Sequence, residues 1–117
     1  MRSTFPLALA ALLLGHSSAV SAATEDCRWV DGRLSTYNGT PSFRIWPKGT
    51  KRLLGVISRS GAAEGSEVLP AMVARMQPSF DRDLWGSFQV CPQTPEHAGW
   101  MTMVVVTDAR RLIAKRR

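Results

Sequence analysis

Apolar and polar residues alternate along three short segments in the first half of the chain. In residues 29–37, Val30 and Leu34 share one face, and polar or aromatic side chains occupy the other. Residues 42–46 alternate in the same way, and residues 51–57 form a third, more apolar run. A period of two is the signature of a half-buried strand, so this pattern predicts three β-strands.

Turn-forming residues separate these three segments. Residues 38–41 are Asn-Gly-Thr-Pro, and residues 47–50 are Pro-Lys-Gly-Thr. Asn-Gly accepts positive φ angles, and proline cannot donate to a strand ladder, so both stretches favour turns. The Asn-Gly-Thr triplet also matches a glycosylation acceptor. The turn is the stronger interpretation, because a proline follows directly.

The period changes after a loop rich in Ser, Gly and Ala at residues 58–66. Four apolar residues are spaced i, i+3, i+4 and i+7, namely Leu69, Met72, Val73 and Met76. This spacing predicts a short helix at residues 69–76 whose apolar stripe faces the sheet. We therefore expect Met72→Asp to destabilise the fold strongly, because a buried charge would lack a partner.

Two further strands are predicted in the second half of the chain. Residues 84–90 alternate, and residues 100–107 are apolar on both faces, as in a central strand. A loop at residues 92–99 joins them, and a last short strand is expected at residues 108–114.

The predicted order is β-β-β-α-β-β, which is that of a five-stranded OB-type barrel. Gly32, Gly55 and Gly86 fall within strands, where a barrel requires a bend or a close approach. The alternative is an antiparallel sheet covered by one short helix. In either case the fold class is mainly β, with one domain.

The first 22 residues have the parts of a secretory signal peptide. Arg2 supplies a positive charge, residues 7–14 form an apolar block, and Val20 and Ala22 occupy the −3 and −1 positions. The block is shorter than the ~20 residues of a membrane-spanning helix. We predict cleavage after Ala22, which leaves 95 of the 117 residues as one domain, 23–117, with no transmembrane span. The expected location is the periplasm or the exterior of the cell.

The predicted mature part is basic and contains all four tryptophans. The whole chain has 15 basic and 9 acidic residues, and loss of Arg2 lowers its net charge from +6 to +5. This balance favours anionic partners such as nucleic acid, anionic lipid or acidic glycans. Solubility alone explains it equally well.

The chain has only two cysteines, Cys27 and Cys91. In an oxidising compartment such a pair predicts one structural disulfide, contributing roughly 4 kcal/mol for a loop of this size. A metal site or a redox pair is the alternative. Neither is favoured, because no Cys-x-x-Cys occurs and His97 is the one histidine left after cleavage.

Residues suited to catalysis are sparse. His97 lies in a loop rich in Pro and Gly, and no Gly-x-Ser-x-Gly sequence is present. Four carboxylates suit turns and caps better than a catalytic pair: Glu64, Glu67, Asp81 and Asp83. The sequence has no tight metal-ligand set and no glycine-rich phosphate loop. We predict no catalytic residue, no metal and no cofactor.

Aromatic and basic residues share the outward positions of the first two predicted strands and the turn that follows. The predicted binding face consists of Trp29, Arg33, Tyr37, Arg44, Trp46 and Lys51. Aromatic planes beside cations can stack on bases or sugars while the cations neutralise anionic groups. The alternative is that the tryptophans fill a core. In an OB-type barrel, Arg44, Trp46, Lys51 and His97 would lie around one groove.

Two segments resemble a known protein family. Residues 32–46, GRLSTYNGTPSFRIW, are followed by GT and then by RLLGV at residues 52–56. Residues 85–92, WGSFQVCP, match a second block. The chain resembles an uncharacterised family of small secreted proteins of Gram-negative bacteria, with the motif GRLSxYNGTPSxRIW…GTxRxLGV. The resemblance implies a periplasmic or secreted setting and implies no activity.

One departure from that family concerns cysteine. Its members often carry a further cysteine in the strand after Met101, where this chain has valines at residues 104–106. Cys27 and Cys91 are therefore the one available intramolecular pair.

We predict a non-enzymatic binding module that holds an anionic ligand or polymer through its aromatic and basic strand face. One alternative is a structural or inhibitory module that docks on another protein, and a second is a minor envelope hydrolase or nuclease. The candidate partners are an anionic glycan, a lipid headgroup, a nucleic acid or an envelope protein. We expect a monomer.

Overall fold

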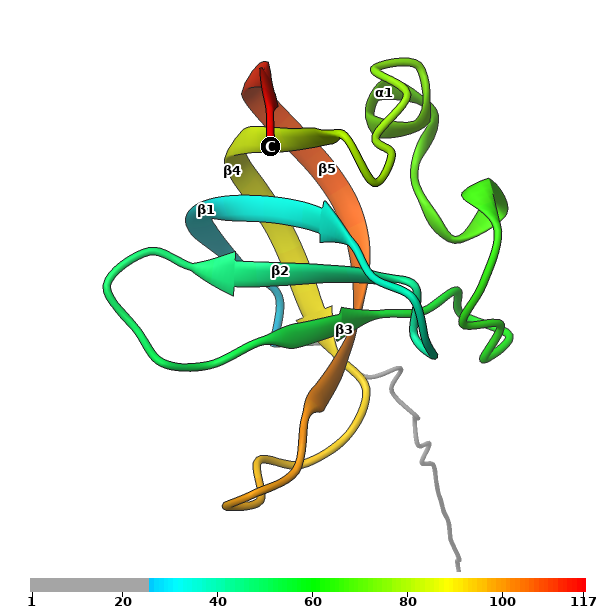
Figure 1. Ribbon diagram of the computed structural model, residues 1–117. Helices are drawn as coiled ribbons and strands as arrows, with labels where there is room; N and C mark the ends of the chain where they lie inside the picture. Colours follow the sequence, from blue (N-terminus) through cyan, green and yellow to red (C-terminus); the bar gives the residue numbers. More distant parts are fainter. Residues whose placement is uncertain (1–25) are drawn as a thin grey trace, which may run out of the picture.

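The described residues fold into a closed barrel of five strands. The structure is a computed structural model, which describes residues 26–117, and the predicted signal peptide lies outside them. The strands are β1 (Arg28–Thr36), β2 (Phe43–Pro47), β3 (Leu54–Val56), β4 (Arg82–Pro92) and β5 (Thr102–Arg116). A 3-10 turn (Ser66–Val68) and a one-turn helix, α1 (Ala71–Ala74), connect β3 to β4 (Figure 1).

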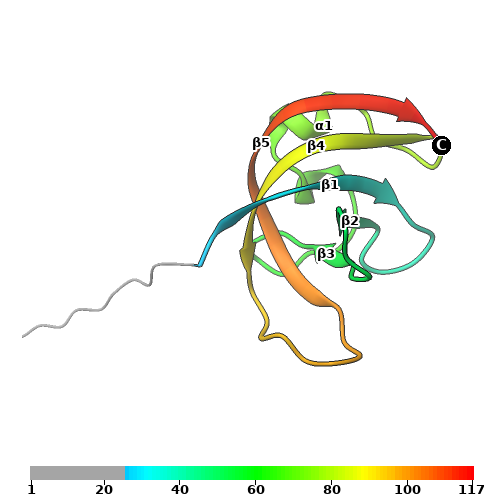
Figure 2. The same cartoon turned by 90° about the vertical axis from the view of Figure 1, so that its left-hand side faces the viewer.

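The strand order around the barrel is β1-β2-β3-β5-β4, and β4 pairs with β1 to close it. Figure 2 shows β5, β4 and β1 running side by side. The pairs are antiparallel except for β3 with β5, which is parallel. The mainly β prediction is confirmed, and the order of elements is that of the OB-type barrel. The parallel pair distinguishes this barrel from a wholly antiparallel sheet.

The last strand is longer than the sequence suggested. The segments predicted at residues 100–107 and 108–114 form one strand, β5, of 15 residues. Its pairing with β4 shifts register twice, between Trp85 and Ser87 and between Gln89 and Val90. Such irregularities bend a long strand and increase its twist, which allows β5 to follow the curve of the barrel.

The core lies inside the barrel and is closed at one end by the segment between β3 and β4. Leu34, Ile45 and Phe88 are fully buried there, and Val73 of α1 packs against them in one cluster. The prediction that Met72 faces the sheet is wrong, since its exposed fraction is 36%. A single helical turn presents only one side to the barrel, and Val73 occupies it. The expected effect of Met72→Asp therefore does not follow.

Two features fix the β1 strand against its neighbours. A Cβ atom on Gly32 would overlap the carbonyl oxygen of Trp46, which confirms the close approach predicted at this glycine. The predicted disulfide between Cys27 and Cys91 is present. Because Arg28 pairs with Val90, the two cysteines extend the β1–β4 register by one pair. Within residues 26–117, no helix has the length and apolar character needed to cross a membrane.

Candidate functional site

Aromatic rings and cations alternate across the outer surface of four strands. The register places Trp46 of β2, Arg33 of β1 and Trp85 of β4 in one row. The guanidinium carbon of Arg33 lies 5.2 Å from the ring centroid of Trp46 and 5.6 Å from that of Trp85. On β5, Lys115 Nζ lies 5.5 Å from the Trp85 centroid. We call these four residues, Trp46, Arg33, Trp85 and Lys115, the ladder.

Strand alternation explains why the ladder faces outward. Leu34, Ile45 and Leu84 are fully buried, so the residue beside each of them on its strand points away from the core. The indole Nε1 of Trp46 donates a hydrogen bond of 2.7 Å to the carbonyl oxygen of Thr50, which orients the ring. All the ladder rings are half-buried and lie outside the core cluster.

The cations of the ladder are held by rings rather than by carboxylates. Among the described residues, neither Arg33 nor Lys115 forms an ion pair, and Arg33 Nε is buried without a hydrogen-bond partner. Each cation–π contact contributes on the order of 0.5–2 kcal/mol, depending on desolvation. The rings Trp46 and Trp85 also meet edge to face, with centroids 6.1 Å apart. The positive charges are therefore positioned but not neutralised.

A second ring and its cations adjoin the ladder at the end of β1. The guanidinium carbons of Arg44 and Arg117 lie 4.6 Å and 5.6 Å from the Tyr37 ring centroid. Arg44 pairs with Ser35, two positions along the register from the ladder row. Arg44 Nε donates to the carbonyl oxygen of Pro41 at 2.9 Å, and Arg117 forms an ion pair with Asp83 at 3.3 Å. We call Tyr37, Arg44 and Arg117 the Tyr37 cluster.

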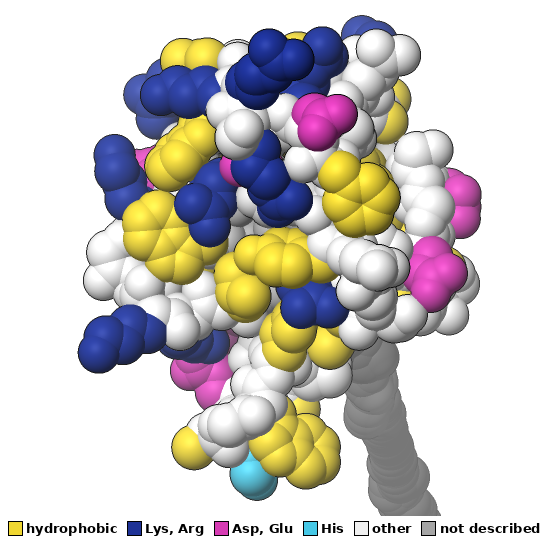
Figure 3. Space-filling view, in the orientation of Figure 1, with side chains coloured by type: hydrophobic (Ala, Val, Ile, Leu, Met, Phe, Trp, Pro, Cys, Tyr) yellow, Lys and Arg dark blue, Asp and Glu magenta, His cyan; other side chains and the backbone are white. Residues whose placement is uncertain are grey.

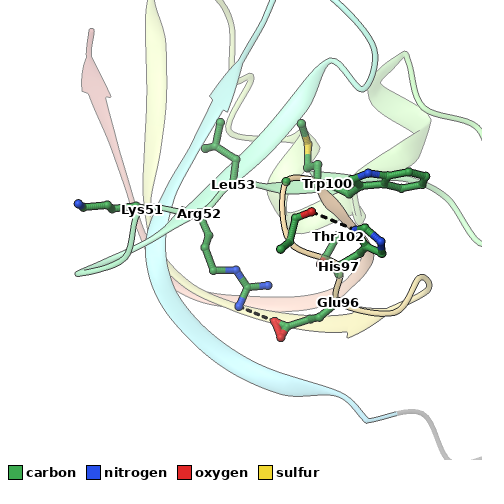
Figure 4. A pocket seen from close by; sticks show the side chains of 10 residues that line it. Lys51, Arg52, Leu53, Glu96, His97, Trp100 and Thr102 are labelled. Atoms are coloured by element: carbon green, nitrogen blue, oxygen red, sulfur yellow. Dashed lines mark hydrogen bonds and ion pairs between the residues drawn. The ribbon is translucent and has the colours of Figure 1, made fainter.

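Two of the six predicted face residues do not join these groups. Trp29 stacks instead with Arg110 of β5, whose guanidinium carbon lies 3.8 Å from its ring centroid. Lys51 is exposed on the β2–β3 loop, and Figure 4 shows it pointing away from the neighbouring side chains. The structure thus brings together Arg33 with Trp46, and Tyr37 with Arg44.

The surface over β1 and β2 is correspondingly mixed in character. Figure 3 shows Lys and Arg side chains interleaved with hydrophobic ones over this face. The ladder and the Tyr37 cluster supply the rings and cations that the distances above connect.

A separate hollow of about 600 Å³ lies beside the β4–β5 loop (Figure 4). Its rim carries Trp100, which is 74% exposed and lies 4.8 Å from the His97 ring, centroid to centroid. Arg52 and Glu96 form an ion pair of 2.5 Å across it. Lys51 and His97 line this hollow, whereas the other two residues expected in an OB-type groove, Arg44 and Trp46, do not.

Sequence reasoning missed Trp85 and Lys115. A signal for Trp85 was present, because it alternates with Leu84 and Phe88, which were expected to point inward. In an OB-type barrel the first and fourth strands are neighbours, so Trp85 could have been placed beside Arg33. Lys115 gave no such signal, because its position depends on the register shifts of β5.

Within residues 26–117, no group of three or more His, Cys, Asp or Glu side chains is arranged to hold a metal ion. Comparisons of the chain with protein-family models, with curated proteins and with solved structures find no match.

Proposed function

We propose that this protein is a non-enzymatic binding module whose ladder and Tyr37 cluster hold an anionic polymer. The observation that supports the proposal is the alternation of rings and cations across four strands, with Arg33 and Lys115 left without a carboxylate partner among the described residues. A surface of this kind attracts negative charge and keeps its own cations in place.

The ladder favours binding because its cations are already ordered. A free arginine or lysine loses rotamer entropy when a ligand immobilises it, at roughly 0.5–1.5 kcal/mol per side chain. Arg33 lies between two rings and Lys115 lies over one, so part of this loss has occurred in the free protein. The half-buried rings leave limited area for full stacking. We therefore assign most of the affinity to charge, with counterion release as the driving term.

We also propose that the protein acts outside the cytoplasm, in the periplasm or beyond it. Disulfides persist mainly in oxidising compartments, and the chain has one between Cys27 and Cys91. The signal-peptide pattern of residues 1–22 supports the same location.

The proposal is tested by titrating the oxidised protein with three anionic polymers at low salt: polygalacturonate, lipopolysaccharide and oligothymidylate. We expect binding to at least one, with an affinity that falls steeply as salt rises. Arg33→Ala and Arg44→Ala should each weaken binding and lower the slope of log K against log salt by about 1. Trp46→Ala should cost roughly 1–3 kcal/mol if the polymer stacks on the ring.

The matched control is Arg75→Ala, which removes one exposed cation beside α1, away from the proposed face. It should leave both affinity and slope close to those of the unsubstituted protein. Absence of binding to all three polymers would refute the proposal. An equal loss for Arg75→Ala would show that net charge, rather than the ladder, attracts the polymer.

A further inference from the structure

A second hollow, of about 390 Å³, lies between β1, β4 and β5 directly beside the ladder. Trp85 forms part of its wall, and three cationic side chains line it, from Lys48, Arg111 and Lys115. Lys115 belongs to the ladder, whereas the other two cations come from the β2–β3 loop and from the irregular part of β5.

Arg111 reaches this hollow because of a bulge. Trp85 pairs with Ile113 and Ser87 pairs with Arg110, so two residues of β5 stand opposite Gly86 where a regular strand has one. Leu112 packs against the core, and Arg111 is the additional residue. Regular alternation would turn the partner of Gly86 inward, whereas the bulge gives the outer face one more cation.

This arrangement imposes backbone strain on Arg111. Its φ angle is 57°, in the left-handed region that residues with a Cβ atom rarely adopt. The strain costs on the order of 1–2 kcal/mol. Glycine or asparagine would relieve most of it, yet the chain has arginine here. Strained residues of this kind cluster at functional sites, where the surrounding structure holds them in place.

A short hydrogen-bonded chain fixes the guanidinium. Arg111 Nη2 donates to Ser87 Oγ at 3.3 Å, and the Ser87 hydroxyl donates to the Asp31 carboxylate. The Asp31 carbonyl oxygen accepts from the backbone N–H of Lys48 at 2.8 Å, which ties the β2–β3 loop to the same point. Asp31 is thus turned toward Ser87.

We propose that this hollow binds a phosphate monoester group. Its three cations and the single carboxylate of Asp31 give a local charge of +2. A phosphate monoester carries about −1.5 to −2 at neutral pH and offers three acceptor oxygens, which matches that charge. Arginine with two lysines also suits a tetrahedral oxyanion. The assignment deepens the proposed function, since the group would be a substituent of the polymer held by the ladder.

The test compares ethyl phosphate, inorganic phosphate and ethyl sulfate, titrated into the oxidised full-length mature protein and followed by NMR at constant ionic strength. Ethyl sulfate has nearly the same shape as ethyl phosphate but a single charge. We expect ethyl phosphate to bind at least fivefold more tightly than ethyl sulfate, and to change the chemical shifts of Ser87 and Trp85. Binding of inorganic phosphate without the ester would refute a monoester ligand, and equal affinity for the sulfate would refute the charge match.

The variant that separates function from structure is Arg111→Gly. It removes the cation and also relieves the left-handed strain, so the midpoint of thermal unfolding should rise or stay constant while ethyl phosphate binding falls at least tenfold. Arg110→Ala is the control, because Arg110 stacks on Trp29 outside the hollow. Unchanged binding by Arg111→Gly, or a lowered unfolding midpoint, would assign Arg111 a purely structural role.

The charge match also predicts a pH dependence. The second pKa of a phosphate monoester is near 6, so its affinity should fall between about pH 7 and pH 5, whereas that of ethyl sulfate should not. The groups facing the ligand are Asp31, Lys48, Arg111 and Lys115. An equal fall in affinity for ethyl sulfate would show that the pH dependence comes from the protein, and it would refute the charge match. The polymer-binding face is tested separately with Arg44→Ala, because Arg44 contacts Tyr37 and lines no part of the hollow. This variant should leave ethyl phosphate binding intact even if polymer binding is lost.

Discussion

The tryptophans of the ladder and Trp100 of the β4–β5 loop present the same side chain under opposite conditions. Trp46 and Trp85 lie on strands, are half-buried and contact the cation of Arg33. Trp100 lies on a loop, is 74% exposed and has its ring contact with His97 of the same loop. The strand rings are held by neighbours on three strands, whereas the loop ring is held by its own loop.

This difference shows that residue type alone does not define a binding face. In the ladder, strand register sets which cation meets which ring, so the chemistry is built into the barrel. On the loop, the Trp100 ring leaves its apolar surface in water, so we expect it to contribute little to the free energy of folding. Under the proposed function, the same contacts in the ladder would therefore serve both stability and binding, whereas the loop ring would serve neither.

The largest effect should come from removing the disulfide that joins β1 to β4, two of the strands that carry the ladder. In the double variant Cys27→Ala, Cys91→Ala, the 64-residue cross-link is lost, and we expect unfolding in urea to show a loss of roughly 4 kcal/mol. The mechanism is greater entropy of the unfolded chain. Reduction of the unsubstituted protein should give the same shift. A loss below about 1 kcal/mol would show that the unfolded chain retains structure that already holds residues 27 and 91 close together.

A smaller effect is expected from Trp85→Ala. The ring is half-buried and contacts Arg33, Lys115 and Trp46, so we expect a loss of about 2 kcal/mol, near half that of a fully buried tryptophan. Urea unfolding measures it. If the loss of unfolding free energy does not exceed that of Trp100→Ala, the matched variant on the β4–β5 loop, the ladder is not a structural unit.

That matched variant, Trp100→Ala, should give the smallest effect. An exposed ring on a loop contributes within about 0.5 kcal/mol of zero to stability. We also expect unchanged polymer binding, and loss of the tryptophan fluorescence that acrylamide quenches most readily. Weakened polymer binding would extend the binding face to the β4–β5 loop and remove the contrast between the two regions.

Much of the fold follows from the sequence, because strand alternation is a local property. Residues such as Val30 and Leu34 mark the inner face directly. The length of α1 did not follow, since four apolar residues at helical spacing suggested two turns where packing supports one. Met72 was misplaced for that reason.

The candidate site was predictable in part. Arg33, Trp46, Tyr37 and Arg44 were identified from alternation, and the structure joins them in pairs. Arg111 could not be found, because a bulge opposite Gly86 decides where its side chain points, and no local pattern encodes it. Trp29 was grouped by alternation along residues 29–37, but in the structure it stacks on Arg110 of β5 instead. Lys51 was grouped because it follows the second strand, but it lies on the exposed β2–β3 loop.

The short strand β3 has a dynamic consequence. Three residue pairs join it to β5 and two join it to β2, whereas ten join β4 to β5. Local opening of the native state follows the joints with the fewest buried backbone hydrogen bonds. Amide protons of Leu54 and Val56 therefore exchange with solvent sooner than those of β4. We therefore expect the barrel to open first along the two edges of β3, while the long β1–β4 pairing, which the disulfide extends, stays closed.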